Sequence, residues 1–149
     1  MKIVIQRCST AKVEVNHKVI SEISTGMMIL VGISLLDTED DIGYIVKKIM
    51  NLRIFEDEAG VMNLAINDIK AEILLISQFT LLAKTKKGNR PSYINAARPE
   101  QAIPIYNTLI NQLQNQLLTK IKTGLFGANM QVSLINNGPV TIIIDSKNK

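Results

Sequence analysis

The sequence predicts an α+β fold: a single layered domain of mainly antiparallel strands with two principal helices and barrel-like sheet packing. Many short apolar runs carry strand signals, whereas only two segments, near residues 38–52 and 99–117, have helical apolar spacing. A length of 149 residues suits one domain, and a hydrophobic fraction of 46% can form a core without disulfides. We therefore expect one domain over residues 1–149.

Strand signals dominate the start of the chain. Residues 2–7 alternate weakly between apolar and polar side chains, residues 11–16 alternate cleanly, and each predicts a strand. Residues 16–18 predict a turn into another strand that runs to Ile23. Residues 27–33 predict a buried strand.

The first helix is predicted after Thr38, which can cap it, with Asp41 three residues further on. Acidic residues crowd its first turn, where they favour the helix dipole. Its apolar stripe consists of Ile42, Ile45, Val46, Ile49 and Leu52. Residues 53–55 then predict a short extended segment, and residues 56–60 an acidic turn.

The second half is predicted to begin with a central strand over residues 72–79. Its four consecutive aliphatic residues, 73–76, indicate burial on both faces. Residues 83–95 predict a loop, and a second helix begins near Pro99, with Pro104 delaying its regular start. That helix has an apolar face of Ile105, Leu109, Ile110, Leu113 and Leu117. Strands over residues 123–126, 130–135 and 140–145 complete the prediction.

The composition bounds the environment and the partner. A single cysteine excludes an intrachain disulfide and favours the cytoplasm, and we expect neither a secretory signal nor a membrane span. Residues 1–72 carry 8 basic and 11 acidic residues, whereas residues 73–149 carry 9 basic and 2 acidic ones. No acid lies between Glu72 and Glu100, so this basic segment suits a phosphate-bearing partner. A solvated loop without a partner explains the charge equally well.

Several familiar chemistries lack their residues. The chain has one histidine, one cysteine and few acids beyond residue 72, which are too few ligands to favour a protein-bound metal. We therefore expect no metal and no cofactor. A Ser-His-Asp triad would need His17, which lies in a predicted turn. Residues 124–127 lack the lysine of a phosphate-binding loop. Cys8 has no base near it in the sequence and is better read as a small core residue.

Small polar groups instead gather at the ends of two predicted strands, in the segments Ser77-Gln78-Phe79-Thr80 and Asn136-Asn137-Gly138-Pro139-Val140-Thr141. The hydroxyls of Ser77 and Thr80 lack an activating base nearby, so hydrogen bonding suits them better than nucleophilic attack. The sequence thus favours a site built from backbone groups, hydroxyls and the substrate itself.

These two segments, with linking blocks in the same order, resemble the D-aminoacyl-tRNA deacylase family over essentially the whole chain. The linking blocks are residues 5–7, 51–57, 62–64, 87–92, 123–128 and 130–134. The resemblance implies hydrolysis of the ester between a D-amino acid, or glycine, and the terminal adenosine of tRNA. It also implies a homodimer with sites at the subunit interface. In the family the Gly-Pro peptide, here Gly138-Pro139, is cis and enters the partner's pocket, where its carbonyl oxygens exclude the side chain of an L-amino acid.

The resemblance also suggests roles for single residues. Ser77 and Gln78 would position the substrate, Thr80 would line the reacting centre, and the amides near Phe79 and Thr80 would stabilise an oxyanion. The Phe79 side chain by itself is more typical of a core. The expected substrate-binding residues are Arg7, which braces the Gly-Pro loop, Phe126, Met130, Asn136, Gly138, Pro139, Val140 and Thr141. Lys84, Lys86, Lys87 and Arg90 would contact tRNA phosphates.

Two departures from the family and two rival interpretations remain. The segment Lys70-Ala71-Glu72 replaces a Gly-rich approach to the central strand. The family often has Asp where this chain has Asn137, which removes a charge beside the Gly-Pro turn. A non-catalytic RNA-binding module would use the same basic loop, but Tyr93 is the only aromatic residue between Phe79 and Tyr106. A dimeric scaffold with a structural Gly-Pro turn is the third interpretation.

Overall fold

The computed structural model describes residues 1–86 and 88–148. Its two long helices are α1 (Glu39–Asn51) and α2 (Pro99–Gln114), with a short 3-10 helix, η1 (Phe79–Leu82), between them. Its strands are β1 (Lys2–Val15), β2 (Lys18–Ile23), β3 (Gly26–Gly32), β4 (Phe55–Glu56), β5 (Met62–Leu64), β6 (Glu72–Ser77), β7 (Lys122–Thr123) and β8 (Gln131–Asp145). The sequence analysis also predicts mainly strands with two principal helices.

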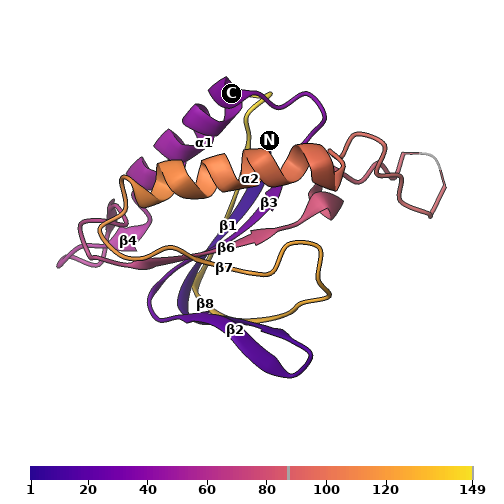
Figure 1. Ribbon diagram of the computed structural model, residues 1–149. Helices are drawn as coiled ribbons and strands as arrows, with labels where there is room; N and C mark the ends of the chain where they lie inside the picture. The colour runs from indigo at the N-terminus through magenta and orange to yellow at the C-terminus, as the bar shows by residue number, and fades with distance from the viewer. Residues whose placement is uncertain (87, 149) are drawn as a thin grey trace.

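Strand β1 organises the main sheet because it has partners along both edges. One edge pairs with β8, while the other pairs with β3 over its first half and with β2 over its second. All three pairings are antiparallel, and the parallel strands β6 and β7 extend the sheet beyond β3. The sheet curls into a nearly closed barrel, so the α+β, barrel-like prediction is confirmed (Figure 1).

Both helices cover one face of the sheet (Figure 1), and a second apolar cluster on the other face joins residues of β1, β3, β6 and β8 to Ile23 of β2. Strand β6 serves both layers. Ile73 and Leu75 face the helices, while Leu74 and Ile76 face the second cluster, which also contains Cys8. The prediction of a strand buried on both faces is confirmed, and so is the core position of Cys8.

Helix α1 follows its predicted pattern closely. The Asp41 carboxylate accepts hydrogen bonds from the backbone N–H of Thr38, at 2.8 Å, and from its hydroxyl, which fixes the first turn. The buried stripe comprises Ile42, Ile45, Val46 and Ile49, as expected. Leu52 lies just beyond the helix and is only partly buried.

Several predicted strand boundaries were wrong. Residues 2–7 and 11–16 form one continuous strand, β1, and residues 130–135 and 140–145 belong to one strand, β8. Gly138-Pro139 therefore lies within an irregular strand and does not form a turn between two strands. The central strand ends at Ser77, and the predicted strand 123–126 shrinks to β7. In each case the pairing partner, which is remote in sequence, sets the boundary.

Helix α2 begins at Pro99, as predicted, but Pro104 lies inside it and does not delay its start. Helix α2 continues through Pro104 in its second turn, although a proline there removes one i→i−4 hydrogen bond and crowds a carbonyl group. Leu109 and Leu113 are buried as expected, and Tyr106 is a buried residue that the sequence analysis missed. Among the described residues, no helix is both long and apolar enough to span a bilayer.

Candidate active site

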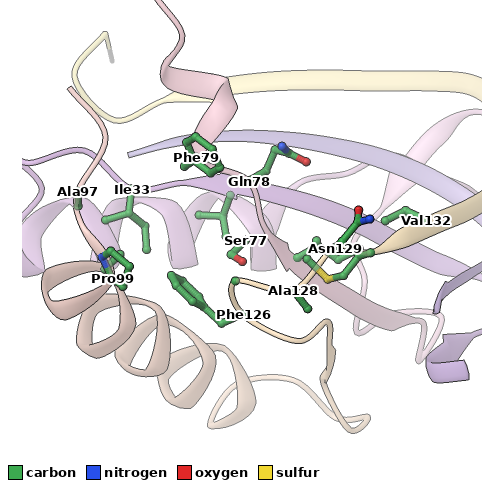
Figure 2. Close-up of a pocket in the computed structure, with 15 residues that line it drawn as sticks. Ile33, Ser77, Gln78, Phe79, Ala97, Pro99, Phe126, Ala128, Asn129 and Val132 are labelled. Atoms are coloured by element: carbon green, nitrogen blue, oxygen red, sulfur yellow. The ribbon is translucent and has the colours of Figure 1, made fainter. Parts of the chain in front are cut away.

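A cavity of about 490 Å³ opens where the parallel strands β3 and β6 end. The carboxyl ends of parallel strands are a favoured place for ligands in open α/β sheets, because the chain leaves a crevice there. Helix α2 begins beside the cavity, and the segment after β7 forms its far wall (Figure 2). The lining residues are Val31, Ile33, Ile76, Ser77, Gln78, Phe79, Ala97, Pro99, Ala102, Phe126, Gly127, Ala128, Asn129, Met130 and Val132.

The chemistry of this lining is unusual for a catalytic pocket. None of the described residues that line it carries a carboxyl, imidazole, thiol, phenol or amine. Its polar side chains are those of Ser77, Gln78 and Asn129. Elsewhere in the described ranges, no three His, Cys, Asp or Glu side chains group as metal ligands would. The polar groups that this chain itself brings to the cavity are therefore amides, a hydroxyl and backbone groups.

The corner between β6 and η1 lies beside the cavity. Gln78 donates its N–H to Val31 at 2.7 Å, and Leu81 and Ala83 donate to Gln78 and Thr80 in the 3-10 turn. The first residues of a 3-10 turn have no acceptor three residues earlier within the turn. The N–H groups of Phe79 and Thr80 therefore take no part in the hydrogen bonds of the turn itself. This sharp corner explains why the strand ends at Ser77.

Thr80 lies at the edge of this corner. It is not among the residues that line the cavity, and its hydroxyl accepts a hydrogen bond from the side-chain amide of Gln78. The Phe79 side chain, which the sequence analysis took as more typical of a core, is 55% exposed and lies at the cavity's rim (Figure 2). The backbone turn directs it outward.

Tyr106 supports the cavity from below. Its hydroxyl donates to the Leu75 carbonyl at 2.8 Å, and its ring lies against Phe126, with centroids 5.8 Å apart. Burial raises the pKa of Tyr106, so the phenol keeps its proton. The same Leu75 carbonyl accepts from Gly124 at 3.1 Å. Strand β6, helix α2 and the cavity wall thus meet at one carbonyl group.

The Gly138–Pro139 segment forms a wide bulge in β8. Gln6 of β1 stands opposite Thr141 and Cys8 opposite Asn136, so four residues of β8 bulge out against one residue of β1. The Gly138–Pro139 peptide is cis, and both residues are exposed. Asn136 closes the base of the bulge because its side chain accepts from Val140 N–H at 2.7 Å and donates to the Val140 carbonyl.

Arg7, the β1 residue facing this bulge, is only 4% exposed. Its Nε donates to the Asn137 carbonyl at 2.8 Å, and one terminal nitrogen donates to Ile54 at 2.7 Å. The other terminal nitrogen pairs with Glu56 at 3.2 Å. Arg7 thus ties the bulge to the segment after α1. The contact uses the Asn137 carbonyl and not its side chain, so Asn in place of Asp leaves it intact.

Apart from Thr80, the predicted site residues fall into three groups. Ser77, Gln78, Phe79, Phe126 and Met130 line the cavity. The second group surrounds the bulge and does not line this cavity in the single chain: Arg7, Asn136, Gly138, Pro139, Val140 and Thr141. The third group lies on the basic loop between η1 and α2 and consists of the predicted tRNA contacts Lys84, Lys86, Lys87 and Arg90.

The basic loop projects beyond the start of α2 (Figure 1). Its base is pinned by two backbone hydrogen bonds between Lys84 and Ser92, at 2.8 and 3.0 Å. Lys84, Lys86 and Arg90 are exposed, and among the described residues none of the three forms an ion pair. Lys87, the fourth predicted tRNA contact, lies outside the described residues.

Residues 4–145 match the family model described as D-Tyr-tRNA(Tyr) deacylase. The chain belongs to this family. It is 58% identical to the D-aminoacyl-tRNA deacylase of Flavobacterium psychrophilum over 149 residues, covering 100% of this chain and 99% of the relative. The relative of the same name from Cytophaga hutchinsonii is 58% identical over 146 residues, covering 98% and 97%. The family resemblance inferred from the sequence is thus confirmed.

Two solved structures share the fold. One, titled c-Myc DNA Unwinding Element Binding Protein, has a TM-score of 0.92 and 45% identity, covering 97% of this chain and 98% of the other. A probable eukaryotic D-amino acid tRNA deacylase has a TM-score of 0.81 and 15% identity, covering 96% and 97%, which shows the fold alone. Family membership makes the chain an enzyme of the hydrolase class, and the relatives' names support the expected deacylase activity.

Proposed function

We propose that this chain hydrolyses the ester bond of D-aminoacyl-tRNA, and of glycine attached to the wrong tRNA, in the cytoplasm. The observation that carries the proposal is a cavity without a titratable side chain in a chain of this family. Ester hydrolysis is a reaction that backbone donors and the substrate's own groups can promote without a protein base.

In the proposed reaction, a water oxygen bonds to the ester carbonyl carbon, and the bond from that carbon to the ribose oxygen breaks. The proton that the water loses passes to the ribose oxygen through the neighbouring 2′-hydroxyl of the terminal nucleotide. The N–H groups of Phe79 and Thr80 stabilise the oxyanion, since they open η1 beside the cavity. Ser77 and Gln78 position the terminal adenosine, with Phe126 and Met130 as the wall.

Chirality is proposed to be tested by a second subunit. The Gly138-Pro139 bulge is exposed and lies outside the chain's own cavity, yet Arg7 and Asn136 hold it firmly. A firmly held, exposed backbone segment suits insertion into the cavity of a partner copy. Its carbonyl oxygens would hold the substrate's amino group and leave no room for an L side chain, so specificity arises by rejection. Glycine, which has no side chain, passes the same filter.

The test compares D-tyrosyl-tRNA and L-tyrosyl-tRNA with the purified protein and a chelator present. We expect rapid loss of the D ester only. Equal rates for both esters would contradict the chiral filter, and no loss of either by folded protein would contradict the enzyme function. Thr80→Ala tests the backbone-centred mechanism: it should keep tRNA binding and most turnover, because the backbone N–H remains. Abolished turnover with intact binding would show that the hydroxyl is essential.

A second candidate function, nucleic-acid binding without catalysis, is favoured by the exposed basic loop and by the DNA-binding title of the structure that is 45% identical. Competition separates the two candidates. If duplex DNA displaces tRNA at equal concentration and no ester is hydrolysed, binding alone is the function.

A further inference from the structure

We propose that Phe79 and Tyr93 together form a stacking platform for the base that precedes the terminal adenosine of tRNA. The proposal rests on the proposed function, because it extends the same site outward by one nucleotide. Helix η1 and the basic loop separate the two residues in the sequence, so the contact between their rings could not be predicted from it.

The two rings form a pair at the surface. Their centroids are 4.9 Å apart and their planes meet at 73°, an edge-to-face arrangement. Phe79 is 55% exposed and Tyr93 is 37% exposed. Among the described residues, no other aromatic side chain is exposed to this extent. Because an edge covers only one face of the ring it meets, the pair keeps an open aromatic face for a flat ligand.

The pair lies between the cavity and the cations. Phe79 lines the rim of the cavity, while Tyr93 directly follows Ser92, which pins the base of the basic loop to Lys84. From inside to outside the order is therefore cavity, ring pair and basic loop. A tRNA end offers its groups in the same order: the ester and terminal adenosine, the preceding base, and then the phosphates of the strand.

The chemistry of the surroundings suits a single-stranded nucleic acid. Unpaired bases stack on exposed aromatic rings whatever their sequence, and nearby cations hold the backbone. The chain has no acidic residue between Glu72 and Glu100 to repel phosphates. Among the described residues, the Tyr93 side chain has the ring contact with Phe79 and no hydrogen bond that a base would need to displace, while its backbone carbonyl accepts from Ala96 at 2.9 Å.

The direct test uses an RNA hairpin that ends in the single-stranded acceptor sequence of tRNA, with the fluorescent base 2-aminopurine in the penultimate position. Stacking on a ring quenches this fluorophore, so binding should lower its emission. Tyr93→Leu should remove most of the quenching and weaken binding roughly five- to a hundredfold. Tyr93→Phe, which retains the ring, should behave as the unchanged protein does. Ile94→Ala, at an exposed neighbouring position, is the matched control.

A second measurement locates the base on the platform. We expect Tyr93→Leu to lower the ratio of kcat/KM for D-tyrosyl-tRNA to kcat/KM for D-tyrosyl-adenosine about tenfold, because only the tRNA has a preceding base. An unchanged ratio, or a full quench in Tyr93→Leu, would overturn the proposal. A changed oligomeric state in Tyr93→Leu with an unchanged ratio would assign the pair to a contact between copies and would also overturn it. Failure of the unchanged protein to hydrolyse either D ester would instead refute the proposed function.

Discussion

At the scale of single residues, the arginine of β1 connects two distant segments through one buried group. Arg7 donates to Asn137 in the bulge and to Ile54 after α1, and both acceptors are backbone carbonyls. A guanidinium group supplies these donors in a fixed plane, which a lysine cannot reproduce. The link between the Gly138–Pro139 bulge and the segment after α1 thus depends on one side chain.

Arg7→Lys should therefore lower the free energy of unfolding by about 1–3 kcal/mol, because at least one buried carbonyl loses its donor. D-ester hydrolysis should also fall, since the bulge loses its brace. Chemical denaturation and a deacylation assay measure the two effects. Glu56→Gln is the control: its side chain is 56% exposed, so it should cost less than about 1 kcal/mol. Equal stability of Arg7→Lys and the unchanged protein would contradict this role.

At Gly138 both the backbone conformation and the close neighbours favour glycine. Its φ is +141°, and an added Cβ would lie 2.7 Å from Val140 Cγ2 and 2.9 Å from Val140 N. Gly138→Ala should therefore distort the bulge and reduce D-ester hydrolysis at least about tenfold, with fold stability reduced by only about 1–3 kcal/mol. Gly60→Ala, at another positive φ but in open space, is the matched control. Full activity in Gly138→Ala would refute the role of the bulge.

Where a motif supplied the information, the sequence singled out residues that the structure places around one cavity. The cavity residues Ser77, Gln78, Phe126 and Met130 came from the family resemblance and lie together. The exposure of Phe79 could not be predicted, because hydrophobicity alone suggests burial and only the turn after Ser77 directs the ring outward. Tyr106 could have been found, since it lies on the helical face shared by Leu109 and Leu113.

At the scale of elements, the end of β8 is fastened to the start of α1. The Asp41 carboxylate accepts from Ser146 and from Lys147, each at 2.6 Å, and from Thr38 at 2.8 Å. Burial opposes ionisation of Asp41, but these hydrogen bonds outweigh it and hold the pKa of the carboxyl below its usual value. The contact therefore requires the ionised carboxylate.

The pKa of Asp41 is lower in the folded protein than the ordinary Asp value near 3.9, which applies to the unfolded chain. Ionised Asp41 therefore stabilises the fold at any pH above that ordinary value, and this stabilisation is lost as the pH falls toward the folded-state pKa. We expect the free energy of unfolding to fall as the pH is lowered below about 4. Asp41→Asn should be less stable at neutral pH and should show a shallower acid dependence. Denaturation series between pH 7 and 2.5 check this. Parallel pH profiles for the two proteins would contradict the assignment.

The elements themselves were largely predictable, but their ends were not. Helix α1 was fixed by local signals, a capping residue and an apolar stripe, so its prediction held. Strands β1 and β8 were each divided in two, because Cys-Ser-Thr at 8–10 interrupts the alternation and Asn-Asn-Gly-Pro at 136–139 looks like a turn. Pairing between β1 and β8 carries both strands through these segments as bulges, and no local signal reports that.

At the scale of the whole molecule, the charged loop is separate from the uncharged cavity. The cavity lining has no charged residue, whereas Lys84, Lys86 and Arg90 project on the loop beside it. The sequence showed the basic segment, and the structure adds its place next to the rim. The protein would thus bind the tRNA backbone with one surface and react with its end in another.

Binding of tRNA should accordingly depend on salt. Each of Lys84→Gln, Lys86→Gln and Arg90→Gln should weaken binding and reduce the slope of log K against log salt by about 1. Titrations at several salt concentrations measure the slope. Lys18→Gln is the control, since Lys18 is exposed at the start of β2, away from the loop (Figure 1). If the three loop variants have the same salt slope as Lys18→Gln, the loop does not contact tRNA.

The central claim is that one subunit supplies the reacting cavity and another supplies the chiral filter. Ser77→Phe would fill the cavity and Gly138→Ala would distort the bulge, so each variant alone should be nearly inactive on D-tyrosyl-tRNA. Mixed dimers of the two would contain one intact composite site. Co-folding them in equal amounts should restore D-selective hydrolysis to about a quarter of the unmutated level. No restoration in confirmed mixed dimers would contradict the claim.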